Sequence, residues 1–343
     1  MKRLTPLVAG LAAALIVALT ATTPGMADTP PRQIAMGVSE PTWYDVNSVD
    51  TVTAELGGHQ PAIWSVWSDW GDTGDTAHPG TGPFANIQPV IDGLSAKGIV
   101  PQVYWEPLDP SNPTDCAHWS LQNIINGDHD PYIQAWAQAA ATDGSPIILR
   151  FAHEMNGNWY IWGNGRCTNN SKKFRQAWRH VWAIFHAAGA TNVKFEYSII
   201  NTQYVTSDYP GNAYVDYLGL TALDWGVSRR PWRSLVQLMS PAMTALRKDS
   251  KTKPVIVGEI GANYRPKCSS CDKSAFFSTG YPAAVAQWPQ IVAMVYFDYN
   301  LPSEPKSPDW RLTSPPAALD AYKALLDNGT TGNPTEFQGT FPQ

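Results

Sequence analysis

IILRF at residues 147–151, SKKFRQAWRHVWAIFHAAG at 171–189 and VKFEYSI at 193–199 form the clearest strand–helix–strand pattern in the chain. The first and third segments are short, nearly continuous apolar runs, which are typical of strands buried on both faces. The second segment repeats its large apolar residues at spacings of three and four and stops at Gly189, as an amphipathic helix does. Two such strands joined by a helix indicate an α/β fold.

The same alternation continues on both sides of this unit. Strand-like runs occur at 34–38, 62–67, 100–105, 147–151, 193–199, 217–223, 255–257 and 291–297. Helical patterns occur at 87–97, 132–142, 171–188, 235–248, 274–287 and 317–326, with a weaker one at 45–56. Eight strands separated by helices predict a single (β/α)8 TIM barrel, and their span is close to the ~250 residues typical of that fold. An open doubly wound sheet is the alternative, but the first strand lacks a Gly-rich phosphate-binding turn.

The two ends of the chain do not resemble the middle. Lys2 and Arg3 precede an apolar run at 7–19, and small residues then lead to a possible cleavage point before Asp28. This pattern predicts a secretory signal at 1–27 and an extracellular protein with no membrane attachment after cleavage; an uncleaved anchor is the alternative. We expect a catalytic barrel over 28–327 and a flexible tail over 328–343, which is polar and rich in Gly, Pro and Thr.

Composition narrows the possible partners. Of the 343 residues, 43% are hydrophobic and 15% are charged, which argues against a disordered protein. The net charge of −5 makes a nucleic-acid partner unexpected. No His-x-His motif or clustered ligand set is visible, so we expect no metal and no cofactor. We also expect a monomer. The four cysteines allow three pairings, of which we favour Cys116–Cys167 and Cys268–Cys271.

Carboxylates and aromatic residues gather where the predicted strands end, which is the catalytic end of a (β/α)8 TIM barrel. Aromatic faces stack on sugar rings and carboxylates bind hydroxyls, so this rim predicts a carbohydrate substrate. Glycoside hydrolysis needs two carboxyl groups on either side of the bond that breaks. Glu154 and Glu259 qualify, and Glu106 and Asp298 are further candidates that composition does not separate. Other residues at the strand ends that we expect to contact sugar are Trp105, Trp225 and Tyr296.

Residues 150–163, RFAHEMNGNWYIWG, resemble the acid/base signature of glycoside hydrolase family 26. VGEIGA at 257–262 is similar to the nucleophile strand of that family, and WEP at 105–107 also resembles it. The resemblance extends over residues 34–327. The family contains β-mannanases, some mixed-linkage β-glucanases and β-1,3-xylanases.

The resemblance implies a retaining mechanism with Glu154 as acid/base and Glu259 as nucleophile. It implies that His153 lines the sugar site and that Arg150 holds the nucleophile ionised and oriented. Trp159 and Trp162 would shape the cleft beside strand four, and Trp225 would do so beside strand six. Glu106 is expected to bind substrate.

One position departs from the family pattern. After strand six the family pattern has a tyrosine that binds the nucleophile, where this chain has Leu223. Either another group orients Glu259 or the substrate differs. The leading hypothesis is a secreted endo-β-mannanase acting on a polysaccharide. The alternatives are a β-1,3-1,4-glucanase or another β-glycanase of the family, and a catalytically silent carbohydrate-binding barrel.

Overall fold

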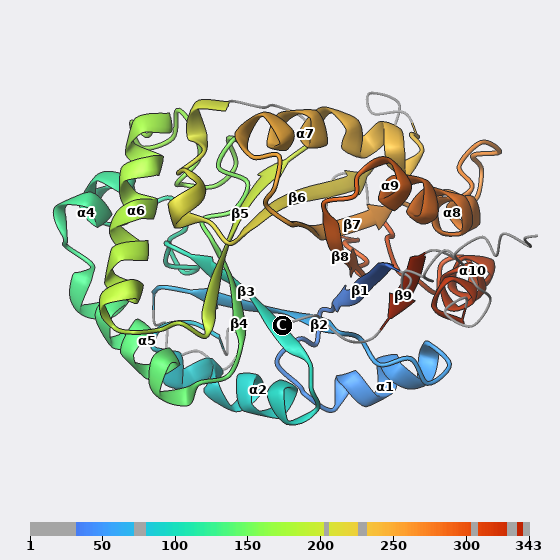
Figure 1. Cartoon of the computed structure of the whole chain (residues 1–343), viewed down its shortest axis with the longest axis horizontal. Helices are drawn as coiled ribbons and strands as arrows, with labels where there is room; N and C mark the ends of the chain where they lie inside the picture. The colour runs from blue at the N-terminus through green and yellow to red at the C-terminus, as the bar shows by residue number, and fades with distance from the viewer. Residues whose placement is uncertain are drawn as a thin grey trace, which may run out of the picture. The chain divides into compact units, whose positions relative to one another are not determined.

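The computed structural model describes residues 32–71, 80–201, 206–225, 232–302 and 308–327, together with the backbone of 335–338. Eight parallel strands close into a barrel, because β1 pairs with β2 on one side and with β8 on the other (Figure 1). The strands are β1 (Arg32–Ser39), β2 (Ile63–Asp69), β3 (Val100–Glu106), β4 (Ile147–Phe151), β5 (Val193–Ile200), β6 (Tyr217–Asp224), β7 (Val255–Ala262) and β8 (Ile291–Phe297). All eight predicted strands are present, so the predicted (β/α)8 TIM barrel is confirmed. The predicted signal at 1–27 lies outside the described residues.

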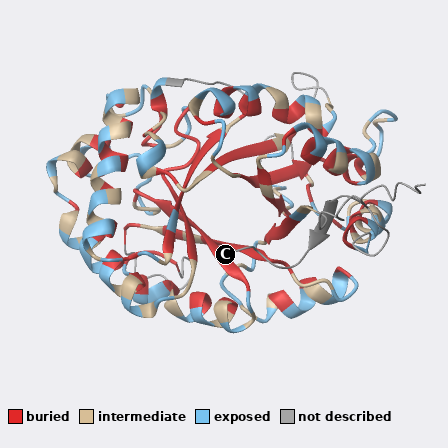
Figure 2. Ribbon diagram, viewed as in Figure 1, coloured by how far each residue is buried: buried red, intermediate tan, exposed pale blue. Residues whose placement is uncertain are grey.

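Helices surround the barrel and turn their apolar sides towards it (Figure 2). The longer ones are α1 (Ser48–Glu55), α2 (Phe84–Ala96), α5 (Asp130–Asp143), α6 (Ser171–Ala187), α7 (Leu235–Asp249) and α10 (Pro316–Asp327). One helix was predicted over 274–287, but three pieces occur there: α8 (Lys273–Ala275), the π-helical η3 (Phe276–Gly280) and α9 (Tyr281–Gln287). Short elements that the sequence pattern did not predict are α3 (Cys116–Trp119), α4 (Leu121–Asn126), η1 (Thr206–Asp208) and η2 (Asn212–Tyr214). Elements of one or two turns are too short to display a helical period.

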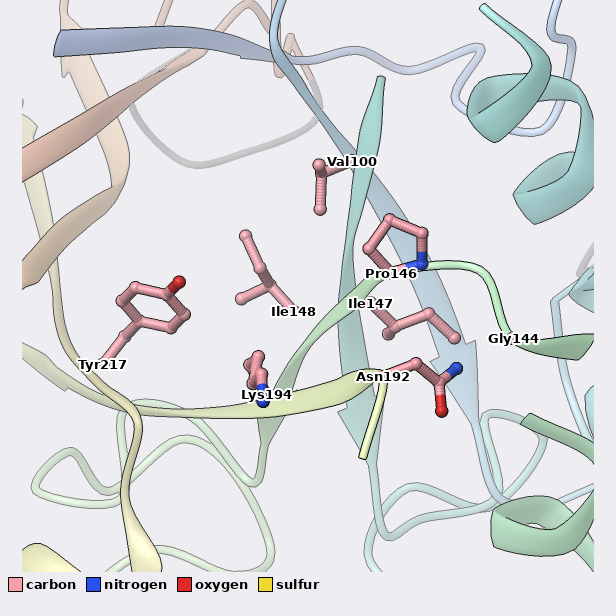
Figure 3. Close-up of a pocket in the computed structure, with 8 residues that line it drawn as sticks. All are labelled: Val100, Gly144, Pro146, Ile147, Ile148, Asn192, Lys194 and Tyr217. Carbon is pink, nitrogen blue, oxygen red and sulfur yellow. The ribbon is translucent and has the colours of Figure 1, made fainter. Parts of the chain in front are cut away.

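The two ends of the barrel interior differ in character. Towards the start of the strands, the interior is apolar and includes Ile63, Val100, Ile148 and Ile256. An apolar cavity of about 280 Å³ opens at this end, lined by Val100, Gly144, Pro146, Ile147, Ile148, Asn192, Lys194 and Tyr217 (Figure 3). Towards the end of the strands, the interior holds charged and polar side chains instead, and these are described below. The functional site is therefore expected at the carboxyl ends of the strands.

Two disulfides are formed in the pairing favoured from the sequence. Cys116 bonds Cys167 with a Cα–Cα distance of 5.2 Å, and Cys268 bonds Cys271 at 5.3 Å. The first ties the long loop between β4 and α6 to the start of α3. The Asn169 side-chain amide holds the same loop by donating to Ile161 O at 2.9 Å. These two ties position the loop that carries Glu154 and Trp159.

Four residues of the expected flexible tail are regular structure. Thr335–Gln338 form β9, which pairs in parallel with Arg32–Ala35 of β1. The neighbouring strand β2 pairs with β1 only at Gly37 and Val38, so the first half of β1 has free backbone groups on that side. The backbone of β9 therefore pairs with groups of β1 that β2 leaves free. Among the described residues, no helix combines the length and apolar character needed to cross a membrane.

Candidate active site

A sharp turn after β4 places Glu154 at the mouth of the barrel. Ala152 and Glu154 have φ values of 44° and 52°, in the left-handed region that residues other than glycine seldom occupy. The turn is held at both sides: Ala152 N donates to Trp105 O at 3.1 Å, and Glu154 N donates to Ser198 O at 3.0 Å. Strained backbone that the surrounding structure holds in place is common at functional sites.

The Glu154 carboxyl is adapted to carry a proton near neutral pH. Its residue is only 6% exposed, and burial followed by the charge of Glu259 raises its pKa to about 7. The hydroxyl of Thr221, the charge of Arg150 and the indole of Trp159 act in the opposite direction. The indole contact is a hydrogen bond from Trp159 Nε1 to Glu154 Oε2 at 2.9 Å. Glu154 can therefore act as an acid that gives up its proton when required.

The second carboxylate, Glu259, is held by Arg150. Arg150 Nη1 donates to Glu259 Oε1 at 2.5 Å, and both side chains are almost completely buried. The other terminal nitrogen, Nη2, donates to Ser198 Oγ at 2.7 Å and to Thr221 Oγ1 at 2.8 Å. The guanidinium also lies over the ring of Tyr104, 4.5 Å from its centre. This packing fixes the orientation of Arg150 and keeps a positive charge against Glu259.

Strand register places Leu223 two residues beyond the position opposite Glu259. β6 pairs Thr221 with Glu259, and it pairs Leu223 with Gly261. The residue opposite the nucleophile candidate is therefore Thr221, which accepts from Arg150. Of the two explanations left open from the sequence, the structure favours the one in which another group, Arg150, orients Glu259.

His153 and Glu106 form the neighbouring wall. His153 Nε2 lies 3.1 Å from the Tyr160 hydroxyl, and its Nδ1 lies 3.7 Å from Glu106 Oε1. Burial, reinforced by the charge of Arg150, lowers the pKa of His153 well below its usual range. Burial and then the neighbouring Asp69 carboxylate raise the pKa of Glu106 well above its usual range. A neutral imidazole beside a protonated carboxyl offers hydrogen bonds without net charge, which suits an uncharged ligand such as a sugar.

Two of the predicted tryptophans are at least partly exposed. Trp159 is 47% exposed and holds Glu154 through its indole nitrogen. Trp225 follows β6, is half-buried, and packs edge-on against Trp310 with ring centres 4.9 Å apart. Trp159 therefore combines an exposed aromatic face with a direct contact to Glu154, whereas Trp225 is partly exposed at the end of β6.

Three predicted substrate contacts are corrected by the structure. Trp105 is fully buried on the outer side of β3 among Trp136, Phe151 and Phe185, because successive strand residues face opposite sides and its neighbour Glu106 faces inward. Tyr296 is also fully buried and donates to Trp310 O at 2.6 Å. Neither side chain reaches the mouth of the barrel.

Trp162 is the third correction. It is fully buried, stacks on Tyr160 with ring centres 4.4 Å apart, and donates from Nε1 to His153 O at 2.7 Å. It therefore supports the residues that line the site from behind. Its sequence neighbours are part of the loop at the mouth, so sequence proximity alone could not distinguish support from contact.

The hydroxyls that bind Arg150 were not predicted from the sequence. Ser198 and Thr221 are buried on β5 and β6, and Ser198 follows Glu196 by two residues, so Ser198 and Glu196 point to the same side of β5. A polar pair at this period within a buried strand was the available signal.

Asp298, the fourth carboxyl candidate, instead pairs with Glu40; burial and Asp298 raise the pKa of Glu40 to about 10. In the described part of the chain, no group of three or more His, Cys, Asp or Glu side chains is placed to hold a metal.

Comparisons with known proteins agree with this geometry. A model of Glycosyl hydrolase family 26 matches residues 115–273. Endoglucanase H of Acetivibrio thermocellus is 32% identical over 268 residues, which cover 74% of this chain and 27% of the relative. Mannan endo-1,4-beta-mannosidase A and B of Caldalkalibacillus mannanilyticus is 28% identical over 136 residues, which cover 37% of this chain and 25% of the relative. The chain thus spans about a quarter of the length of these curated relatives.

A solved structure shares the fold. A family 26 β-mannanase from Bacteroides ovatus superimposes with a TM-score of 0.62 at 18% identity, over 89% of this chain and 90% of that one. The matched family model includes both the turn that carries Glu154 and the strand that carries Glu259. The family model over residues 115–273 and the relative that is 32% identical over 268 residues place the chain in glycosyl hydrolase family 26, and the solved structure agrees with this in fold.

Proposed function

We propose that the chain is a secreted, retaining endo-β-glycanase in which Glu154 is the acid/base and Glu259 is the nucleophile. The observation that carries the proposal is the contrast between the two carboxyl groups. Burial and Glu259 raise the pKa of Glu154 to about 7, whereas Arg150 donates directly to Glu259. One group is suited to hold a proton and the other to remain a carboxylate, which is the division of roles that retaining hydrolysis requires.

The reaction then has two steps. In the first, Glu154 gives its proton to the glycosidic oxygen while Glu259 attacks the anomeric carbon, so that the glycosidic bond breaks and a glycosyl ester forms. In the second, Glu154 takes a proton from water, the water oxygen attacks the anomeric carbon, and the ester bond breaks with its electron pair returning to Glu259. The half-exposed Trp159 binds the sugar ring next to Glu154.

The proposed substrate is a β-1,4-linked mannan-type polysaccharide. Support comes from relatives named as mannan endo-1,4-beta-mannosidases, among them those of Caldalkalibacillus mannanilyticus and Bacillus subtilis. The exposed face of Trp159 and the uncharged pair of His153 and Glu106 are suited to a neutral polysaccharide.

A β-glucan is the second candidate substrate. The relative that aligns over 268 residues is named Endoglucanase H, whereas the mannosidase of Caldalkalibacillus mannanilyticus aligns over 136. Leu223, in place of the tyrosine of the family pattern, is a further difference close to the site.

Two measurements test the proposal. Reducing-sugar release by residues 28–343 is followed on galactomannan, glucomannan, barley mixed-linkage glucan, β-1,3-xylan and carboxymethyl-cellulose. Hydrolysis of galactomannan supports the first substrate, and activity on barley glucan alone supports the second. Proton NMR of the first product should show the β-anomer. Appearance of the α-anomer first excludes the two-step mechanism, and inactivity of the folded protein on all five favours a carbohydrate-binding role.

A further inference from the structure

A third buried glutamate, Glu196 on β5, lies beneath the two carboxyl groups of the proposed site. It is completely buried in the barrel interior. Its Oε2 accepts from Gln102 Nε2 at 2.6 Å, and its Oε1 lies 3.4 Å from Arg150 Nε. Among the described residues, neither Glu196 Oε1 nor Arg150 Nε has a hydrogen-bond partner. The ion pair between them is therefore the polar contact that these two atoms make.

Arg150 therefore contacts two carboxylates from one guanidinium. Nη1 donates to Glu259, whereas Nε faces Glu196. A hydroxyl adds a second link, because Ser198 accepts from Arg150 Nη2 and donates to Glu196. While Glu259 is ionised, it alone is enough to neutralise the buried cation Arg150. Glu196 is therefore a second anion beyond what that charge needs.

The barrel makes room for this arrangement by omitting side chains. A Cβ at Gly219 would overlap Glu196 Oε1. A Cβ at Gly258 would lie 3.0 Å from both Gln102 Nε2 and Glu196 Oε1, and 3.1 Å from Arg150 Nε. Glycines on β6 and β7 thus leave the space that the carboxylate, amide and guanidinium occupy. The interior is shaped around the network, and Glu196 does not simply fill a gap in it.

The excess anion has a use during the proposed reaction, on which this inference rests. When Glu259 bonds to the anomeric carbon, its carboxylate becomes an ester and loses its charge. Arg150, which is fully buried, would then be an uncompensated cation. We propose that Glu196 is a positioning residue that remains the counter-ion of Arg150 while Glu259 carries the sugar. Glu196 stabilises the glycosyl ester through Arg150 and does not touch the substrate.

The test measures the two steps separately. The probe is a dinitrophenyl glycoside of the disaccharide that the wild type releases, with a fluorine on the sugar ring that is attacked. The fluorine slows both steps, and the activated dinitrophenyl leaving group still allows the glycosyl ester to form. Labelling of wild-type Glu259, located by peptide mass spectrometry, establishes the proposed nucleophile first. If the wild type is not labelled there, the proposed function fails before Glu196 is tested.

Glu196→Gln keeps the shape and removes the charge. Labelling per active site should slow about tenfold, because breaking a buried ion pair leaves the remaining charge uncompensated. Release of the bound sugar should be faster than in the wild type, since the ester has lost stabilisation. The probe concentration that gives half-maximal labelling should stay within about twofold, because Glu196 does not reach the substrate. Glu196→Asp, which restores the charge, should recover most of the labelling rate.

Asp208→Asn is the matched control. Asp208 is also a completely buried carboxylate, but it lies in η1 and pairs with Asn164. Its amide variant should label and release at wild-type rates. If Glu196→Gln does not fold, Ser198→Ala breaks the hydroxyl link between Arg150 and Glu196 and should change both rates in the same directions. Wild-type rates of labelling and release in Glu196→Gln, counted per active site, overturn the inference.

The pH dependence provides a second readout. Burial raises the pKa of Glu196 to about 7, with Arg150, Gln102 and Ser198 acting against burial and Glu259 acting with it. Other titratable groups facing it are Tyr217 and Tyr104. Below this pH the wild type loses the same charge that Glu196→Gln lacks. The ratio of the wild-type labelling rate to the Glu196→Gln labelling rate should therefore fall towards one. A ratio that is constant from pH 8 to pH 5 contradicts a role for the charge.

Discussion

Trp159 Nε1 donates a 2.9 Å hydrogen bond to Glu154 Oε2, although nearly half of the tryptophan surface is exposed. One side chain therefore holds the proposed acid and offers an aromatic face to solvent. The loop that carries it is fixed by Cys116–Cys167 and by Asn156, whose side chain exchanges two hydrogen bonds with the backbone of Ile200. The acid is thus positioned by a residue that is also placed to contact the sugar.

Trp159→Phe should move the basic limb of the kcat/KM profile to higher pH. The indole donates to the charged form of Glu154 and so lowers its pKa; without that bond the pKa rises and the acid stays protonated to higher pH. The phenyl ring retains an aromatic face, so the change in KM should be small. Trp182→Phe is the control, because Trp182 lies on α6, where its ring stacks on His186. An unchanged basic limb in Trp159→Phe would show that the hydrogen bond does not influence the acid.

Glu154→Gln and Glu259→Gln should each reduce kcat by about 10³-fold or more, because each removes a group that acts only during bond breaking. Both amides are isosteric, so the thermal midpoint should remain close to that of the wild type. Glu55→Gln, which alters an exposed glutamate on α1, should keep full activity. Near-normal turnover in either site variant on the natural polysaccharide would reject the assignment of that residue.

The strands and the main carboxylates could be predicted from the sequence, but the role of individual aromatic residues could not. Hydrophobic period identifies a buried strand such as β4, and the string around Glu154 carries the family resemblance on which the role proposed for that residue rests. Period does not determine which of two consecutive residues, such as Trp105 and Glu106, faces the ligand. The contact of Arg150 with Glu259 was implied by the resemblance, but its contacts with Ser198, Thr221 and Glu196 were not predicted, because these residues lie on other strands and meet Arg150 only after the barrel closes. Tertiary burial, and not local sequence, separates Trp159 at the mouth from Trp162 behind it.

Lys273→Met should destabilise the fold by about 2–4 kcal/mol, because it leaves buried carbonyl groups without a donor. Lys273 is 2% exposed, and its Nζ donates to the carbonyl oxygens of Trp310, Arg311 and Ser314 at 2.6–3.0 Å. Denaturant unfolding monitored by tryptophan fluorescence measures the change. Lys172→Met, at an exposed position of α6, is the control and should stay within about 0.5 kcal/mol. Equal stability of the two variants would mean that Lys273 does not anchor the segment 310–314.

Removal of the two disulfides should have unequal effects. Cys116–Cys167 closes a loop of 51 residues, whereas Cys268–Cys271 closes a loop of 3. Loop-closure entropy predicts a loss of about 4 kcal/mol for a Cys116→Ser/Cys167→Ser variant and about 2 kcal/mol for the Cys268→Ser/Cys271→Ser variant, which serves as its matched comparison. The first variant should also lower kcat, because the freed loop carries Glu154 and Trp159. Differential scanning calorimetry and turnover on the polysaccharide measure both effects. If the first variant loses stability but keeps full kcat, Asn156 and Asn169 are sufficient to hold the acid in place.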